Sequence, residues 1–136
     1  MKKILKKTAF TLTLLTGLLL VFIGGRFLFH PEAAETAFGI SVPVHGNFSF
    51  HYIKGIRDLC AGAALMGLLL TGERRGVGVL LLAITPVPVV DLSLVLRAPN
   101  HIATALYPHL IAIVLGAALG IYYIFSTNKN QKHAAL

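Results

Sequence analysis

The five residues 54–58 (Lys-Gly-Ile-Arg-Asp) contain three charges, and an apolar run over residues 59–70 follows them without a polar spacer. A helix that crosses a bilayer needs about 20 residues, so a span that uses this run begins at or before Lys54. Arg57 and Asp58 then lie inside the edge of the membrane. Ionisable side chains at that depth are costly and persist when they pair with one another or with a ligand. The block therefore predicts a buried polar cluster near one end of a membrane helix.

Two groups from other parts of the chain are predicted to lie at a similar depth. Asp91 follows Pro86 and Pro88, which lack amide donors and are expected to kink or open a helix. His109 lies near the start of the last apolar stretch. Counted inward at about 1.5 Å per residue, the acids and the imidazole lie about one to two turns below the outer surface. The candidate catalytic residues are Asp91, His109 and Asp58, and the candidate substrate-binding residues are Lys54, Arg57 and Arg26.

These residue types allow two interpretations. A carboxylate of Asp91 or Asp58 beside the imidazole of His109 would form a proton-transfer pair. Lys54 and Arg57 would then hold an anionic or carbonyl group of a substrate. The alternative is an ion-pair network, Arg57 with Asp91 and Lys54 with Asp58, together with a hydrogen bond from His109 to a freed carbonyl, that only fixes the helices. Breaking such a buried pair costs about 3–5 kcal/mol, so stability alone would account for the charges, and whether the protein is an enzyme is left open.

Metal and cofactor sites have no support in the sequence. No two of the six histidines stand at the three- or four-residue spacing that ligand pairs on a helix favour. The sequence also lacks a phosphate-binding loop, a dinucleotide fingerprint and a motif for a nucleophilic Ser or Cys. Cys60 is the only cysteine, which excludes an intrachain disulfide. We therefore expect no metal and no cofactor.

The elements that must position the candidate residues follow from composition. Of 136 residues, 56% are hydrophobic and 12% are charged, which is typical of membrane proteins and not of soluble globular domains. We predict an all-α integral membrane fold, an antiparallel four-helix transmembrane bundle with a short interfacial helix over residues 30–39, after the first span. The prediction is a single domain over residues 1–136, with spans at about 8–29, 52–70, 77–96 and 102–125 and a flexible polar tail over 126–136.

The net charge of +7 predicts the orientation of the chain in the membrane. Eight of the twelve basic residues lie at the N-terminus, in the turn after the second span and in the tail: Lys2, Lys3, Lys6, Lys7, Arg74, Arg75, Lys129 and Lys132. With four spans these places share one side, and an excess of Lys and Arg marks that side as cytoplasmic. We expect a protein of the inner (plasma) membrane with both termini cytoplasmic and membrane lipid as its partner. Nucleic acid is not expected as a partner, because no aromatic-and-basic platform accompanies the charge.

Small residues in the last span form a seam at helical spacing, Ala112, Gly116 and Gly120. Such a seam allows close contact between membrane helices. His109 lies on the same face. Internal packing is the simpler use, because a four-helix bundle needs close contacts of its own. Contact between two copies of the chain, and so a homo-oligomer, is the alternative.

Several stretches, read together, resemble a known family: Gly25–Pro31, Ala37–Ile40, Lys54–Asp58, Pro88–Asp91 and the histidine of the last span. They are similar to the domain-of-unknown-function 4267 family of small four-span membrane proteins. The resemblance covers about Gly17 to Phe125, and the Lys-Gly-x-Arg-Asp block is its most specific part. A weaker likeness to the DoxX-like group rests on the first span and the proline-containing segment after it. The resemblance implies an integral membrane fold and offers no catalytic residues.

The leading functional hypothesis is a buried polar pocket in the outer half of the bundle. It would bind a small amphiphilic ligand, such as a lipid, a quinone or an isoprenoid, with proton transfer as a further step. The alternative is a structural or accessory membrane subunit whose ion pairs only stabilise the bundle. A proton-coupled transporter is less favoured, because four short spans without visible repeats offer no machinery for alternating access.

Overall fold

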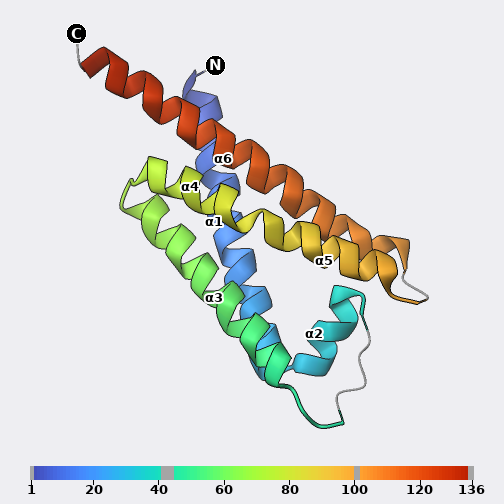
Figure 1. The fold of residues 1–136 in the computed structure, drawn as a ribbon. Coiled ribbons are helices and arrows are strands. Elements are labelled where there is room, and N and C mark those ends of the chain that lie inside the picture. Colours follow the sequence, from blue (N-terminus) through green and yellow to red (C-terminus); the bar gives the residue numbers. More distant parts are fainter. Residues whose placement is uncertain (1, 41–44, 100–101, 135–136) are drawn as a thin grey trace.

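The computed structural model describes residues 2–40, 45–99 and 102–134, and the side chains of residues 3–40, 45–99 and 102–127. Within these residues all regular structure is helical, which confirms the all-α prediction (Figure 1). The elements are α1 (Lys2–Phe29), α2 (Pro31–Phe38), α3 (Ser49–Leu70), α4 (Arg74–Ile84), α5 (Pro86–Arg97), the 3-10 helix η1 (Ala103–Leu106) and α6 (Tyr107–Ala134).

Among the residues that the structure describes, three helical stretches are long and apolar enough to cross a membrane: Lys3–Phe29, Arg74–Arg97 and Ala103–Thr127. The helix α3 is set apart from them by the three charges of Lys54, Arg57 and Asp58. Large apolar side chains are exposed along α1, α3, α4, α5 and α6. Helices that are apolar on their exposed faces are typical of surfaces covered by lipid. The fold therefore fits a small membrane protein.

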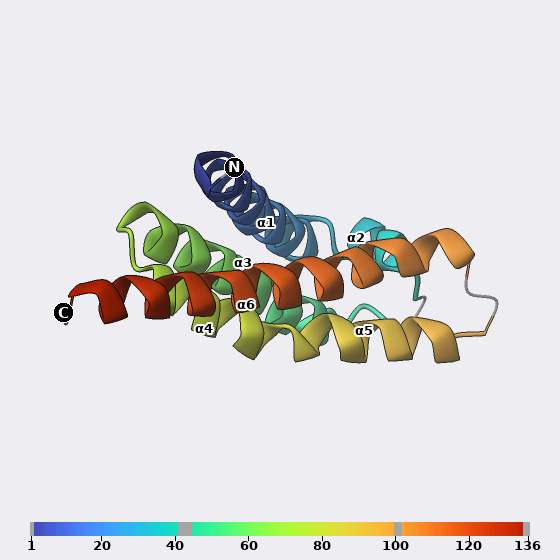
Figure 2. The same cartoon turned by 90° about the horizontal axis from the view of Figure 1, so that it is seen from above.

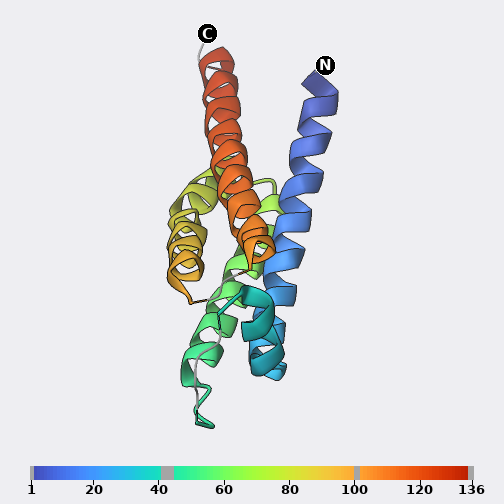
Figure 3. The same cartoon turned by 90° about the vertical axis from the view of Figure 1, so that its right-hand side faces the viewer.

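The long helices pack as two pairs (Figures 1 and 2). In the first pair α1 packs along α3, and in the second α6 packs along the broken helix formed by α4 and α5. The start of α1 and the end of α6 lie at the same end of the molecule (Figure 3). We call this end, with the α3–α4 turn, the terminal end. The pairs diverge toward the opposite end, where α2 lies between them (Figure 1). We call that region, with the end of α1 and the start of α3, the α2 end.

The apolar core lies where the two helix pairs meet. Its buried members are Ala9, Leu65, Leu69, Val77, Leu81, Leu119 and Tyr123. Thr13 of α1 is fully buried beside this core, and its Oγ1 lies 3.4 Å from the hydroxyl of Tyr123 in α6. The core therefore joins the pairs on the side of the terminal end, and the α2 end depends on other contacts.

Glycines bring the backbones of α1 and α3 into close contact. A Cβ on Gly24 would lie 2.5 Å from the Leu59 nitrogen and 2.6 Å from the Gly55 carbonyl oxygen. A Cβ on Gly62 would lie 2.6 Å from the carbonyl oxygen of Gly17. Because no side chain fits at such distances, these glycines fix the two helices in one register.

The predicted seam of α6 faces α4 at two of its three positions. A Cβ on Gly116 would lie 2.5 Å from Thr85 Oγ1, and a Cβ on Gly120 would lie 2.7 Å from Leu82 Cγ. Ala112 is exposed. The two glycines thus serve packing inside the chain, and the homo-oligomer stays a prediction.

A break separates α4 from α5 at Thr85, where the prolines predicted a kink. Thr85 N donates to the Leu81 carbonyl oxygen at 3.1 Å, and Thr85 Oγ1 donates to the same oxygen at 2.7 Å. Pro86 and Pro88 have no N–H to continue this ladder. The helix axis can therefore bend at Thr85, between α4 and α5, shortly before Asp91.

The short helix predicted over residues 30–39 is α2, and the last helix, α6, extends into the predicted tail, whose flexibility stays a prediction. The helix α2 has Pro31 in its first turn and ends at Gly39 with φ 95°, as its sequence predicts. The helix α6 continues through Ala134 rather than giving way to a tail at residue 126. No proline or glycine lies between 126 and 134 to end it. Residues 135–136 lie outside the described part of the chain.

Candidate functional site

Lys54 lies at the centre of the polar cluster at the α2 end. Its Nζ donates to Asp58 Oδ2 at 2.8 Å, one helical turn away, and lies 3.4 Å from Asp91 Oδ2 of α5. The ammonium also lies 5.1 Å from the ring centre of Phe27 and 4.8 Å from that of Phe38, within the range of cation–π attraction. Side chains from α1, α2, α3 and α5 therefore meet at one cation.

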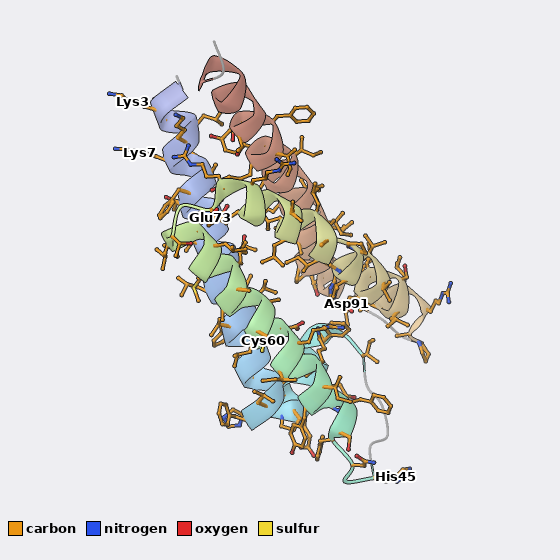
Figure 4. All side chains as sticks on the ribbon, turned by 60° about the vertical axis from the view of Figure 1, so that its left-hand side comes forward. Lys3, Lys7, His45, Cys60, Glu73 and Asp91 are labelled. Carbon is orange, nitrogen blue, oxygen red and sulfur yellow. The ribbon has the colours of Figure 1, made fainter. Side chains whose placement is uncertain are left out.

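The two acids occupy different positions around this cation. Asp58 is buried, with 6% of its surface exposed. The side chain of Asp91 is 16% exposed and extends from α5 toward the gap between the helix pairs (Figure 4). The pairing of Lys54 with Asp58 agrees with the network expected from the sequence.

Arg57 does not reach Asp91 as that network expected. Its Nε lies 3.3 Å from Asp58 Oδ1, and its side chain is 49% exposed. Lys54 makes the contact with Asp91 instead, at 3.4 Å. Exposed pairs contribute about 0–1 kcal/mol, so Arg57 is a minor part of the cluster.

His109 joins the cluster through an aromatic ring. It is 8% exposed, and its ring packs edge-on against Phe38 with 4.7 Å between the ring centres. Its Nε2 lies 3.4 Å from the Phe38 carbonyl oxygen. Over the described residues no hydrogen bond connects His109 to Asp58 or Asp91. The predicted acid–imidazole pair is thus not in contact, and proton transfer stays a prediction.

Arg26 lies apart from Lys54. It donates to the Ala33 carbonyl oxygen at 3.1 Å and lies 6.0 Å from the Phe22 ring centre. It borders a shallow hollow of about 330 Å³ together with Phe22 and Phe29. The next residue, Phe27, faces Lys54, and successive side chains on a helix point about 100° apart. Arg26 therefore faces a different side of α1.

A second acid–base contact at the α2 end was missed by the sequence analysis. His51 Nε2 and Glu35 Oε2 lie 2.5 Å apart, with side chains 10% and 13% exposed. The His51 ring packs against Phe27 and Phe48, and its Nδ1 is buried without a partner. The contact ties α2 to α3. The available signal was spacing, because His51 stands three residues before Lys54 and shares its helix face.

Comparison with known proteins supports the resemblance found in the sequence. The family described as Domain of unknown function (DUF4267) matches residues 17–123. The chain belongs to this family. It matches no curated protein and no solved structure. The matched region includes Lys54, Asp58, Asp91 and His109, so the whole cluster lies in the part of the chain that defines DUF4267.

The chemistry open to this DUF4267 cluster follows from the atoms that are already paired. Lys54 is held by two carboxylates, so it is not free to hold an anion. In the described part of the chain, Asp91 Oδ1 and His109 Nδ1 make no hydrogen bond. No three His, Cys, Asp or Glu side chains converge as a metal site requires among those residues. The open atoms suit a ligand group that donates a hydrogen bond.

Proposed function

We propose that this protein is a four-span membrane protein whose α2-end cluster binds the head group of a small amphiphile. Three of the four spans correspond to helices long and apolar enough to cross a membrane. The fourth is α3, whose 22 residues extend for about 33 Å, enough for a hydrocarbon core of about 30 Å. Its charges lie in its first half and are paired, which lowers the cost of placing them near the membrane.

The proposed orientation places the α2 end on the outer side of the inner membrane. Five basic residues support it by gathering at the terminal end: Lys3, Lys6, Lys7, Arg74 and Arg75. An excess of such residues marks the cytoplasmic side. The amphiphile would then reach the cluster from the outer leaflet.

One observation carries the assignment of the ligand. Asp91 contacts Lys54 through Oδ2 and leaves Oδ1 unpaired within the described residues, on a side chain 16% exposed. Lys54, Arg57, Asp58 and Asp91 together carry no net charge, so they give no attraction for an anionic head group. A hydroxyl head group, as in an isoprenoid alcohol, a quinol or a neutral lipid, would donate to the open oxygen. Proton transfer between Asp91 and His109 would need such a ligand hydroxyl, because the described side chains of His109 and Asp91 make no direct contact.

A structural role is the second candidate, and the position of Lys54 favours it. The ammonium contacts side chains of α1, α2, α3 and α5 outside the main apolar core, in a region where Phe27, Ala34 and Val95 are also buried. In this role the ion pairs hold α5 and α2 against the α1–α3 pair, and no ligand is needed. The cluster would then only stabilise the arrangement of the helices in a structural or accessory membrane subunit.

Native mass spectrometry of protein extracted from membranes in mild detergent separates the two candidates. Wild type should retain one amphiphile of defined mass, and Asp91→Asn should lower its retention about tenfold. That factor corresponds to about 1.4 kcal/mol, the difference between a charge-assisted and a neutral hydrogen bond. Ser93→Ala is the matched control on α5, because Ser93 is exposed and bonds only to the Val89 carbonyl oxygen of its own helix.

The outcomes are distinct. Loss of the amphiphile from Asp91→Asn alone, with the protein still folded in a melting assay, supports binding. If wild type retains no small molecule and Asp91→Asn only lowers the melting temperature, the binding proposal fails and the structural role stands.

A further inference from the structure

A second cavity lies at the terminal end, far along the helices from Lys54. Its volume is about 250 Å³, and it is lined by the start of α1, the α3–α4 turn with the start of α4, and the last part of α6. Its polar lining includes Lys6, Arg74 and Tyr122, and its apolar lining includes Phe10, Leu69 and Val77. The proposed amphiphile site at Lys54 shares none of these residues.

Lys6, Arg74 and Tyr122 carry hydrogen-bond donors that have no acceptor among the side chains that the structure describes. Neither Lys6 nor Arg74 forms an ion pair over the described side chains, although Glu73 stands next to Arg74. The Tyr122 hydroxyl likewise makes no hydrogen bond in that part of the chain. A lysine, an arginine and a tyrosine from three helices thus line one cavity. Phosphate is the anion that such donors suit best, because guanidinium binds two of its oxygens and ammonium adds a point charge.

The apolar lining indicates what carries the phosphate. Leu69 and Val77 are buried, at 6% and 0% exposure, and Phe10 forms part of the same wall. Sites for whole small ligands have volumes of about 300–1,000 Å³, so this cavity is the size of a head group. The rest of such a ligand must lie outside the cavity, along helices whose exposed faces are apolar. A membrane lipid meets both conditions, and a soluble phosphate ester does not.

We propose that this cavity binds the phosphate of an anionic phospholipid, with its first acyl carbons against Phe10 and Leu69. The basic residues of the terminal end predict that it faces the cytoplasmic leaflet, where anionic lipids attract basic segments. Basic cavities between helices on that side are typical sites for such head groups. The lipid would join α1, α4 and α6 at the end where α1 and α6 project beyond the α3–α4 turn (Figure 3).

The test is native mass spectrometry of the full chain released from nanodiscs that contain phosphatidylglycerol and phosphatidylcholine in equal amounts. Wild type should retain phosphatidylglycerol in preference to phosphatidylcholine. The double variant Lys6→Gln/Arg74→Gln should lower this retention about 30-fold, since each basic residue near a membrane surface contributes about 1 kcal/mol.

The matched control is Lys7→Gln/Arg75→Gln, which removes the same charge from the same two helices without touching the cavity. Figure 4 shows Lys3 and Lys7 pointing away from the other helices. Retention should stay within about twofold of wild type. An equal loss in both double variants would mean that charge acts diffusely and not through this cavity, and so would overturn the proposal. Equal retention of the two lipids by wild type would overturn it as well.

Inorganic phosphate distinguishes a lipid from a free anion. Phosphate added to the wild-type nanodiscs should leave phosphatidylglycerol in place, because the acyl contacts are absent from the free ion. Displacement of the lipid by phosphate would overturn the assignment to a lipid. If the double variant does not fold, Tyr122→Phe replaces it, with about fivefold lower retention expected from the loss of one hydroxyl. Unchanged retention in Tyr122→Phe would then contradict the site.

Discussion

At the α2 end Lys54, Arg57, Asp58 and Asp91 form ion pairs with one another, whereas at the terminal end Lys6 and Arg74 have no ion-pair partner among the described residues. The difference follows the apolar core. Near the terminal end, Thr13, Tyr123 and the residues around them join the two helix pairs. At the α2 end the pairs diverge, and Lys54 with its two carboxylates makes the connection.

Charged residues of the same types thus have different roles at the two ends of the molecule. At the terminal end, Lys6 and Arg74 border the cavity that is proposed to bind a lipid phosphate. At the α2 end, where the helix pairs diverge, the Lys54 cation between two acids helps to hold the helices together. Because these groups are buried, the contact is sensitive to the loss of either partner. Predictions that change one end at a time therefore test the difference.

The largest effect is expected for Lys54→Met. The change leaves Asp58 buried at 6% exposure, with only the exposed Arg57 beside it. The free energy of unfolding, measured by denaturant titration in mixed micelles, should fall by about 3–5 kcal/mol. Arg57→Gln is the matched control and should cost less than about 1 kcal/mol. Equal effects of the two changes would contradict the central position of Lys54.

Gly24→Ala tests whether close backbone contact fixes α1 against α3. The added methyl group would meet the backbone of Leu59 and Gly55, and overpacking of this kind costs about 1–3 kcal/mol. Gly25→Ala is the control, because nothing lies within 4 Å of a Cβ there. The same titration should show Gly25→Ala no less stable than wild type, since alanine favours a helix over glycine. A larger loss in Gly25→Ala would show that the pair is arranged differently.

Glu35→Gln tests the contact between α2 and α3 at the α2 end. It exchanges a charge-assisted contact with His51 for a neutral one, and the unfolding free energy should fall by about 0.5–1.5 kcal/mol. Hydrogen exchange should also rise in α2, because this contact ties α2 to α3. Glu32→Gln, an exposed change in the first turn of the same helix, should cost less than about 1 kcal/mol through the helix dipole and leave the contact with His51 in place. Equal exchange rates in the two variants would argue that His51 does not hold α2.

The smallest effect is expected at the terminal end. Lys6→Gln should change the unfolding free energy by no more than about 0.5 kcal/mol in lipid-free micelles, because Lys6 is exposed and has no ion-pair partner over the described residues. A loss comparable with that of Lys54→Met would erase the difference between the two ends.

The parts of the fold and site that depend on one helix could be predicted from sequence. Lys54 and Asp58 pair because they are four residues apart on one helix. The break before Asp91 follows from the chemistry of Pro86 and Pro88. The short helix α2 has its proline and glycine at the expected ends.

The remaining parts depend on how the helices are rotated against each other. Arg57 was expected to reach Asp91, and the contact of Asp91 is instead with Lys54. The spacing of His51 and Lys54 indicates a shared helix face, but the contact of His51 with Glu35 also requires α2 to fold back between the diverging pairs, which that spacing does not indicate. The rotation of α1 that turns Phe27 toward Lys54 and Arg26 away from it is set by the glycine contacts with α3.

A double-mutant cycle on Lys54→Met and Asp91→Asn measures most directly whether one ammonium joins the two helix pairs. The unfolding free energies of wild type, both single variants and the double variant give the coupling between the two side chains. We predict a coupling of about 1–3 kcal/mol, the range for residues in one ion-pair network. Effects that add to within about 0.5 kcal/mol would contradict the connection between α3 and α5 on which the proposed site depends.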